Sequence, residues 1–591
     1  MGKDTKLEMQ NWLENRYSTL YEKLEESDFR LEKAVGVLNK KYKVEKDDVS
    51  AVLSELRKAG RVKVKLDPKD NRRRIYKLIS RGKIILDELS VKDKELTRSE
   101  LYGLLKKAAD LIRTRVDYKF ILILLFLKRV SDKWEEEYNK AYNKALEDGL
   151  NKEQAEKEAS SDIYHDFNLP QEYLWDNLRK DVSKLPGRFS KALKALGEKN
   201  PELKDVIDNV DFIQFTSSRE NFEILRQLAE LFSKRKLHHV SSDILGDAYE
   251  WILRYFAPTK AKEGEVYTPR EVIRLLIEML QPEPGNSIYD PACGSNGMLI
   301  IPYEYVKERR GRKEADKLFL RGQEVNPRTL TLGRMNLYIH NIRNARLMQG
   351  DTLLHPKFKE NSGAKTFDII VANPPWNHKG YNEATLKKGE FWKKRFKYGF
   401  PTKQSADWAW IQHMLASADD NGKVGLVIDN GCLFRSGREH NIRTKVLEDD
   451  LIESVILLPE KLFYNTGAPG ALIMFNKNKE ENRKDKVLFI NASEEYEQHP
   501  DVRKLNILSE ENIRRIADKH IKFEGKKGFS RIVPKDEIKE NDYNLNVTLY
   551  VFPEEEIEEI DIDQEWKELK EVEAEIDNIE EKIKRYLEEI R

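Results

Sequence analysis

Between residues 287 and 476 the sequence alternates short apolar runs with longer stretches of helical periodicity. This alternation predicts a parallel sheet with crossover helices, because consecutive parallel strands need a long crossover connection, usually a helix. The runs that qualify as strands are Ser287–Tyr289, Leu318–Gln323, Arg346–Met348, Phe367–Val371, Lys423–Ile428, Ile452–Leu458 and Ala471–Phe475. We therefore predict a doubly wound α/β domain of seven strands, with its ligands at the carboxyl ends of the strands.

Length and composition exclude several classes of protein. A chain of 591 residues is too long for one compact core, and about three to five domains are expected. The longest apolar run, Phe120–Leu127, is far shorter than the ~20 residues of a membrane span. Two cysteines, Cys293 and Cys432, cannot build a disulfide framework or, by themselves, a zinc site. These features predict a multidomain cytoplasmic protein with no membrane contact and no metal.

The first 93 residues predict a small basic domain. Helical periodicity over 31–38 and 47–58 is followed by two alternating runs, 62–66 and 75–79. Between residues 57 and 83 there are twelve Lys and Arg but only two acids. Two helices and a basic hairpin are typical of a winged helix-turn-helix, which binds either DNA or another protein. We predict such a domain over 1–93 and leave both roles open.

Helical periodicity returns downstream and again in the tail. The stretch from 97 to about 240 predicts a helical domain, which leaves 241–553 for the α/β domain. Residues 554–591 hold seventeen acids and six Lys or Arg, with apolar residues at spacings of three and four from Trp566 to Ile590. This tail is expected to form an amphipathic helix that packs either on a partner helix or on its own chain.

Polar residues suited to a ligand follow successive strands. The first strand leads into Asp290–Gly297 (DPACGSNG), whose small residues allow a sharp turn and close approach to a ligand. Glu324, after the second strand, can accept bonds from two ribose hydroxyls, and Asp351, after the third, can accept one from an exocyclic amine. Since the carboxyl ends of parallel strands share one edge, the sequence predicts a nucleoside-type cofactor there.

The fourth strand runs into Asn373-Pro374-Pro375-Trp376. Two consecutive prolines fix φ and lack an N–H, which holds the Pro374 carbonyl towards the cleft. Together with the Asn373 side chain, this carbonyl offers two acceptors to one amino group, and Trp376 offers a flat face to a planar ring. The pattern favours chemistry on the amine of a base over a merely rigid loop.

These motifs, in this order, resemble those of the amino-methyltransferases that act on adenine N6 in DNA. The segment Glu263–Val272 (EGEVYTPREV) lies upstream of the glycine-containing loop, as in the γ order of motifs. More narrowly, the chain resembles the modification (M) subunit of type I restriction–modification systems over about residues 97–591. The passages that carry this resemblance are Tyr118–Asp132, Leu245–Pro258, Ser405–Leu415, Phe463–Lys477 and Asn541–Val551. The first 93 residues lie outside the usual pattern.

The resemblance implies a fold, a reaction and partners. The fold would be a Rossmann-like seven-stranded methyltransferase domain with an N-terminal helical domain, an extra winged-helix-like domain before it and a C-terminal helical tail. The reaction would transfer a methyl group from S-adenosyl-L-methionine to N6 of a flipped-out adenine in double-stranded DNA. The partners would be a specificity (S) subunit, held between two M subunits, and a restriction (R) subunit.

The resemblance also assigns residues. The catalytic set would be Asn373, Pro374, Pro375 and Trp376. The cofactor-binding set would be Tyr267, Thr268, Pro269, Asp290, Ala292, Cys293, Gly294, Ser295, Asn296, Gly297, Glu324 and Asp351. Cys293 is expected to be a small loop residue, because methylation of an amine needs no covalent attack by the enzyme. Asn296 stands where relatives usually have glycine, and it is expected to adopt a left-handed conformation.

Residues 379–403 combine eight Lys and Arg with six aromatic residues. This composition predicts a loop that orders on nucleic acid. Two alternatives remain for the whole chain. It could be a non-catalytic DNA-binding assembly factor with a vestigial cleft, or an amino-methyltransferase that acts on RNA or protein.

Overall fold

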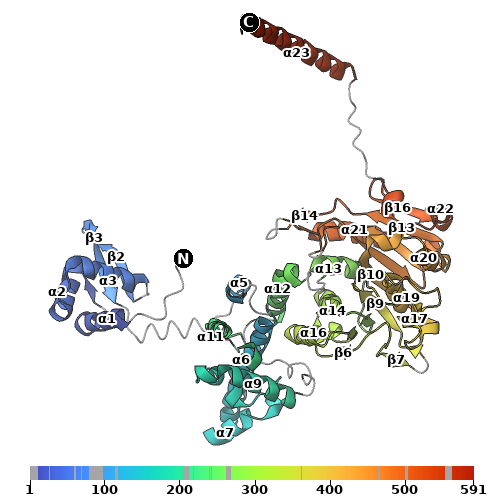
Figure 1. The fold of residues 1–591 in the computed structure, drawn as a ribbon. Helices are drawn as coiled ribbons and strands as arrows, with labels where there is room; N and C mark the ends of the chain where they lie inside the picture. The colour runs from blue at the N-terminus through green and yellow to red at the C-terminus, as the bar shows by residue number, and fades with distance from the viewer. Residues whose placement is uncertain are drawn as a thin grey trace. The chain divides into compact units, whose positions relative to one another are not determined.

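The computed structural model describes residues 11–25, 27–58, 61–67, 70–78, 97–112, 118–200, 203, 212–216, 218–237, 240, 242–260, 268–360, 363–463, 466–499, 504–552 and 562–590. The chain divides into two compact units, 1–252 and 253–591 (Figure 1). Among the described residues, no helix is long and apolar enough to cross a membrane. The division into four domains made from the sequence stays a prediction.

The N-terminal part of the first unit contains the predicted helices and hairpin. Its elements are α1 (Asn11–Leu24), β1 (Asp28–Phe29), α2 (Leu31–Tyr42), α3 (Lys46–Lys58), β2 (Val62–Asp67) and β3 (Asp70–Leu78). β3 lies between β1 and β2 and is antiparallel to both. The apolar faces of the three helices pack on this sheet around a shared core that includes Leu20, Leu38, Leu53 and Leu78. Residues 68, 69 and 79–96 lie outside the described part.

In the rest of the first unit, the described residues are largely helical, as predicted. Its α-helices are α5 (Arg98–Ile112), α6 (Lys119–Glu147), α7 (Lys152–Ala159), α8 (Trp175–Leu178), α9 (Leu185–Lys199), α10 (Phe212–Phe215), α11 (Arg219–Ser233) and α12 (Ser242–Lys260), whose last residues belong to the second unit. The apolar run near the start of α6 is buried from Ile121 to Leu127, which explains its unbroken hydrophobicity.

The second unit is built on a nine-stranded mixed sheet. Its strands are β4 (Ser287–Asp290), β5 (Phe319–Glu324), β6 (Arg346–Gln349), β9 (Phe367–Ala372), β10 (Ala418–Asp429), β11 (Ile452–Leu457), β12 (Gly470–Asn476), β13 (Lys486–Asn491) and β16 (Ser530–Pro534). The order across the sheet is β16-β13-β11-β12-β10-β9-β4-β5-β6. Only β12 and β16 are antiparallel to their neighbours in this sheet.

All seven predicted strands are present, but the prediction of a seven-stranded sheet is wrong in two respects. β13 and β16 extend the sheet beyond β11, and β12 runs against the strands on either side of it. The direction of β12 was missed because a run of apolar residues that is buried on both faces reads the same in a parallel and an antiparallel strand.

Helices cover both faces of the sheet. The main ones are α13 (Arg270–Leu280), α14 (Gly297–Arg310), α16 (Pro327–Ile339), α19 (Asp407–Ser417), α20 (Arg438–Glu448), α21 (Glu510–Lys522) and α22 (Lys535–Glu540). α13, α14, α16 and α21 pack on one face, and α19, α20 and α22 on the other. The side chains of β12 therefore alternate between the two faces. Leu472 and Met474 pack in the core with α13, α14, α16 and α21, and Ala471, Ile473 and Phe475 pack in the core with α19, α20 and α22.

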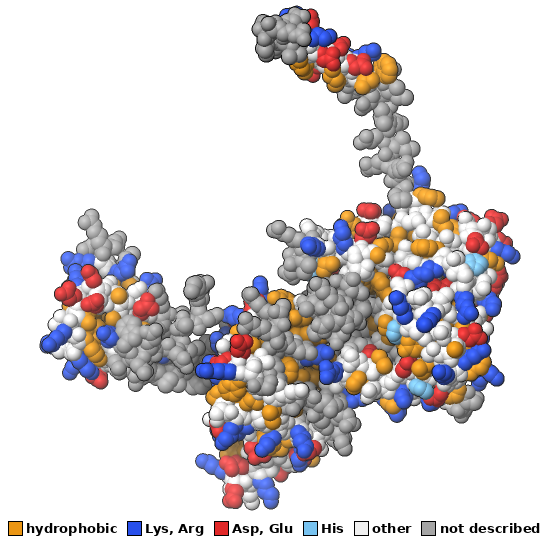
Figure 2. All heavy atoms as spheres, viewed as in Figure 1, with side chains coloured by type: hydrophobic (Ala, Val, Ile, Leu, Met, Phe, Trp, Pro, Cys, Tyr) orange, Lys and Arg blue, Asp and Glu red, His pale blue; other side chains and the backbone are white. Residues whose placement is uncertain are grey.

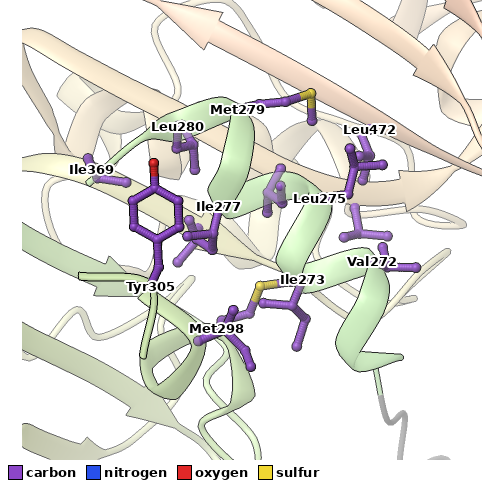
Figure 3. Packing of buried hydrophobic residues seen from close by; sticks show 14 of the residues in the cluster. Val272, Ile273, Leu275, Ile277, Met279, Leu280, Met298, Tyr305, Ile369 and Leu472 are labelled. Carbon is purple, nitrogen blue, oxygen red and sulfur yellow. The ribbon is translucent and has the colours of Figure 1, made fainter. Parts of the chain in front are cut away.

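α13 lies especially close to the sheet. In Figure 3, Leu275 is directed towards Leu472 of β12, and Ile273 towards Met298 of α14. A Cβ on Gly425 of β10 would come within 2.7 Å of Leu276 and 3.1 Å of Leu280, so a larger residue there would require these side chains of α13 to shift. The close packing fixes the start of α13, and therefore the residues just before it, against the sheet.

The chain reverses its direction across the sheet at β4. The first three strands progress from β4 to β5 and β6, and the chain then returns to place β9 on the other side of β4. Such a switch point opens a crevice outside the carboxyl ends of the two central strands. Asp290 ends β4 and Asn373 directly follows β9, so both main motifs belong to this crevice.

The C-terminal tail forms one long helix, α23 (Ile562–Ile590), as predicted. Its apolar side chains follow one side of the helix, visible as the orange side chains in Figure 2. The described members of this seam are between 48% and 61% exposed, and they are Trp566, Leu569, Val572, Ile576, Ile579 and Ile583.

Candidate active site

The loop after β4 donates a backbone hydrogen bond to the carboxylate of Asp290, the residue at which the strand ends and the motif begins. Asp290 is only 1% exposed, and its Oδ1 accepts a bond of 2.9 Å from the Ala292 N–H. Burial, with a smaller contribution from the neighbouring Glu324 carboxylate, raises the pKa of Asp290 to about 8. Gly294 is left-handed at φ +49°, and apart from its own residue and its two chain neighbours no atom lies within 4 Å of where its Cβ would be. The loop therefore leaves open space beside a buried carboxyl group.

Asn296 adopts the left-handed conformation predicted for it, with φ 69° and ψ 19° at the start of α14. The other small residues serve the packing of this loop. A Cβ on Gly297 would meet Ile273 at 2.9 Å, and the Ser295 carbonyl accepts a bond of 2.9 Å from Asn336. Cys293 is buried, and burial raises the pKa of its thiol well above the ordinary value, which disfavours the thiolate form.

Glu324 ties the second strand end to the loop. Its Oε2 accepts from the Gly294 N–H at 3.0 Å, and its Oε1 accepts from the Asn326 N–H at 2.8 Å. Asn326 in turn caps α16 by accepting from the Arg328 N–H at 2.9 Å. The carboxylate is therefore held in one orientation at the sheet edge by two backbone donors.

Asp351 is held by a residue that the sequence did not single out for this role. The Tyr381 hydroxyl donates to Asp351 Oδ2 at 2.8 Å, and the Leu354 N–H approaches Asp351 Oδ1 at 3.2 Å. Burial and this bond to a carboxylate raise the pKa of Tyr381, so its hydroxyl remains a donor across the physiological range. Tyr381 therefore orients the third carboxylate of the site.

Tyr381 belongs to the basic segment 379–403, and the structure corrects what was predicted there. The segment is folded and includes the short helices α17 (Glu383–Leu386) and α18 (Trp392–Arg395). Arg395 is 2% exposed and donates to the carbonyls of Thr352 and Leu353, at 3.0 and 2.7 Å. Phe396 and Tyr398 are buried as well. Arg395 and Phe396 support the loop that follows Asp351, and none of the three side chains is available to stack on nucleic acid.

Both the nitrogen and the oxygen of the Asn373 side-chain amide form hydrogen bonds. Its Nδ2 donates to Thr268 Oγ1 at 2.8 Å, and its Oδ1 accepts from the Trp376 indole N–H at 2.8 Å. An indole nitrogen can only donate, which requires that the oxygen, and not the nitrogen, of the amide faces Trp376. The structure thus joins Thr268, which lies just before α13, to the Asn-Pro-Pro-Trp motif. Tyr267 lies outside the described residues.

Trp376 packs edge-to-face on Phe463, with ring centroids 4.9 Å apart and planes at 69°. A Cβ on Gly470, at the start of β12, would come within 2.7 Å of Phe463 and 3.1 Å of Trp376. Within the motif, Pro374 is buried and Pro375 is exposed. The indole ring is thus held between the motif and the residues leading into β12.

The residue after the motif is fixed by a cluster that sequence reasoning missed. Asn377 is left-handed at φ 54°, and its N–H donates to the buried Asp407 at 2.9 Å. Arg435 bonds the Asn377 side-chain oxygen and the Asp407 carboxylate, and it also contacts Asp429 and Glu439. The one available signal was the Ser405–Leu415 passage, which contains Asp407. This cluster therefore fixes Asn377, the exit of the motif, where the chain leaves Trp376.

Two family models match the chain. The model of N-6 DNA methylases matches residues 240–559, and the model of the HsdM N-terminal domain matches residues 103–232. The first model covers the nine-stranded sheet together with every candidate site residue, and the second covers much of the helical region that precedes it.

The chain is similar to type I restriction enzyme methylase subunits of Methanocaldococcus jannaschii. The MjaVIII subunit is 43% identical over 97% of both chains, and the MjaVII subunit is 41% identical over 99% of this chain and 98% of its own. The HindI methylase subunit of Haemophilus influenzae is 31% identical over 65% of this chain and 86% of its own. The basic N-terminal segment, although outside the usual pattern of the subfamily, thus has a counterpart in the two archaeal proteins.

A solved structure shares the fold. The crystal structure of the type I restriction-modification system methyltransferase subunit from Streptococcus thermophilus superimposes with a TM-score of 0.67 at 25% identity. The match covers 77% of this chain and all of that chain.

Proposed function

Since the chain belongs to the N-6 DNA methylase family, as a methylase subunit of a type I restriction enzyme, we propose that it transfers the methyl group of S-adenosylmethionine to N6 of adenine in DNA. The observation that carries the proposal is that three carboxylates and the Asn373 motif stand at the carboxyl ends of four neighbouring parallel strands, β6, β5, β4 and β9. The carboxylates suit the cofactor, and the Asn373 motif suits an amine.

The residues present fit S-adenosylmethionine by their chemistry. Asp290 would face a cationic group, Glu324 the ribose hydroxyls and Asp351 the adenine amine, and Gly294 leaves open space beside them. Each is the kind of acceptor that the corresponding group requires. When bound, the cofactor supplies an electrophilic methyl group on sulfur. Ala292, Cys293, Ser295, Asn296 and Gly297 would shape the loop, and Thr268, Pro269 and Tyr267 would close over it.

Cofactor binding should release a proton at neutral pH. The raised pKa of Asp290, about 8, keeps this carboxyl protonated at pH 7, and it must ionise to face a cation. Affinity should therefore rise with pH up to about 8, by at most about tenfold per pH unit, and then level off. Calorimetric titration with S-adenosylmethionine in two buffers of different ionisation enthalpy measures the proton directly. Asp290→Asn should abolish the release; binding by the wild type without proton release would contradict the assignment.

At the target amine, the protein's part would be to position and polarise. An adenine inside a duplex must be flipped out, at a cost of a few kcal/mol, and stacking on Trp376 would return about 1–3 kcal/mol. Asn373 Oδ1 and the Pro374 carbonyl would accept the two N–H bonds of the amine and stabilise positive charge that grows on nitrogen. No strong base is required.

Trp376 should do more than stack. Its N–H orients the Asn373 amide, and Trp376→Phe keeps a stacking ring while removing that bond. We expect kcat for methyl transfer to fall about tenfold, corresponding to one hydrogen bond of about 1–1.5 kcal/mol, with little change in KM for DNA. Fluorescence of 2-aminopurine at the target position would report whether the flipped base still stacks. An equal loss of stacking and rate would contradict the orienting role.

The proposed partners follow from the family. The chain would act with a specificity subunit that reads the DNA sequence, in a complex of two methylase subunits with one S subunit, and with a restriction subunit. The exposed apolar seam of α23 suits packing against a helix of the S subunit. The basic hairpin of residues 62–78 suits DNA phosphates as an additional contact.

Mapping of methylated bases tests the proposal. The chain is produced with and without its S subunit in a host lacking DNA methylation, and N6-methyladenine is mapped by sequencing. Modification at one bipartite site only when both subunits are present supports the proposal. Modification by the chain alone would contradict the need for an S subunit, and a formed complex that binds S-adenosylmethionine without modifying adenine would point to RNA or protein as substrate.

A further inference from the structure

An open pocket of about 690 Å³ lies in the catalytic unit outside the site described above. The residues that line it come from two parts of the segment 379–403 and from the start of α20; they include Asn382, Glu383, Lys387, Thr402, Lys403 and Arg438. None of them belongs to the groups proposed to bind the cofactor or the target amine. Six of the seven residues that line it have polar or charged side chains, and three of these side chains are cationic.

Both walls of the pocket are tied to the residues that follow Trp376. On one side, the Gly380 N–H donates to the Lys403 carbonyl at 3.0 Å, and the rings of Tyr381 and His378 lie 4.8 Å apart. On the other side, Arg438 begins α20 three residues after Arg435, which bonds the Asn377 side chain. The pocket therefore lies beside the exit of the catalytic motif.

The charges in the pocket do not cancel. Glu383 forms an ion pair with Lys387 at 2.8 Å and approaches Arg438 at 3.8 Å, so one acid faces three cations with Lys403 included. The Lys387 ammonium also lies 5.5 Å from the ring centres of both Trp392 and Phe400, which limits its motion. Lys387 and Arg438 keep about half of their side-chain surface exposed, at 45% and 56%. The result is a positioned, accessible excess of positive charge.

We propose that this pocket binds the sugar–phosphate backbone of DNA next to the flipped adenine. Phosphates are the ligands that a surplus of Lys and Arg recognises, and Asn382 and Thr402 add neutral polar groups of the kind that contact DNA backbone. A base flipped into the crevice at Asn373 requires its flanking backbone to pass close to the exit of the motif, where the pocket lies. This inference rests on the proposed function, because the backbone in question belongs to the DNA that would be methylated.

The salt dependence of DNA binding tests the proposal. The full complex of methylase and S subunits is assayed with a DNA duplex containing its site, and log Kd is measured against log salt. Each of Lys387→Gln, Lys403→Gln and Arg438→Gln should lower the slope by about 0.9, because each variant neutralises one phosphate fewer. Specific and nonspecific duplexes should be weakened by similar factors, because a bond to the backbone carries no sequence information.

Lys317→Gln is the matched control. Lys317 is exposed and pairs with Glu314 at 2.6 Å, as Lys387 pairs with Glu383, but it precedes β5 at the amino end of the strand, away from the crevice. For Lys317→Gln, the slope of log Kd against log salt should equal that of the wild type. Thermal unfolding of each variant would show that the folded complex is intact.

Unchanged slopes in all three pocket variants would overturn the proposal. So would variants that bind DNA normally but lose the S subunit, since the pocket would then serve a protein partner. Failure of the proposed function looks different, because the wild-type complex itself would not methylate adenine. A reduced slope in the pocket variants together with a wild-type slope in Lys317→Gln supports the site.

Discussion

Replacing Asn373 by alanine should lower kcat for methyl transfer by about 10²–10³-fold, the usual cost of removing one preorganised polar group from a reaction centre. The Asn373 oxygen is oriented by Trp376 and its amide nitrogen by Thr268, so the group is in place before a base arrives. Affinity for S-adenosylmethionine should stay nearly unchanged, because the cofactor acceptors lie at the ends of other strands. Single-turnover methylation and calorimetric titration of the cofactor give the two quantities.

Asn421→Ala is a suitable control for this variant. Asn421 is an exposed asparagine of the same unit, in β10, where it accepts a bond from Asn478 at 2.9 Å. Its removal should leave both quantities at wild-type values. An Asn373→Ala protein that no longer binds S-adenosylmethionine would refute the assignment of Asn373 to the target amine, and one that methylates at the wild-type rate would do the same.

The second large effect is expected for replacement of Glu324, which should weaken binding of the cofactor. Glu324→Ala should raise the Kd for S-adenosylmethionine at least about 100-fold, because hydrogen bonds to a charged group contribute about 1.5–3 kcal/mol each and the bonds to two ribose hydroxyls are removed. The variant also leaves the N–H groups of Gly294 and Asn326 without their acceptor, which loosens the loop. Titration with S-adenosylmethionine and with S-adenosylhomocysteine should show the same weakening, since the ribose is common to both.

Glu308→Ala serves as the comparison for Glu324→Ala. Glu308 is an exposed acid on α14 of the same unit, paired with Arg274 at 2.7 Å. Its replacement should leave the Kd for the cofactor at the wild-type value. At saturating cofactor, Glu324→Ala should recover much of the wild-type kcat, which Asn373→Ala should not. Cofactor affinity unchanged by Glu324→Ala would mean that the ribose is held elsewhere.

The strands and the acidic strand ends were predictable because their signals are local. Asp290, Glu324 and Asp351 each follow a short apolar run, and the rule that ligands bind at the carboxyl ends of parallel strands needs no knowledge of long-range contacts. The left-handed Asn296 was predictable for the same reason. The order of β10, β12 and β11 was not, since it depends on which strand pairs with which.

The residues that hold the site in place were not predictable from local pattern. Tyr381 reaches Asp351 across 30 residues of sequence, and Arg435 reaches Asn377 across 58. The burial of Arg395, Phe396 and Tyr398 in segment 379–403 was missed because charged and aromatic residues that alternate irregularly look like surface. Arg395 is buried there because carbonyl oxygens of neighbouring loops satisfy its donors. Only the folded chain brings those oxygens together.

The position of β12 constrains how the protein is made. This strand follows β11 in the chain yet lies between β10 and β11 in the sheet. During synthesis, the edges of β10 and β11 that face β12 therefore have no partner strand until residues 470–476 have been made. Premature termination before that point would leave the β12-facing edges of β10 and β11 unpaired, a template for association between nascent chains. The same late strand carries Gly470 against Trp376, so the ring at the catalytic motif reaches its final packing only when the sheet closes.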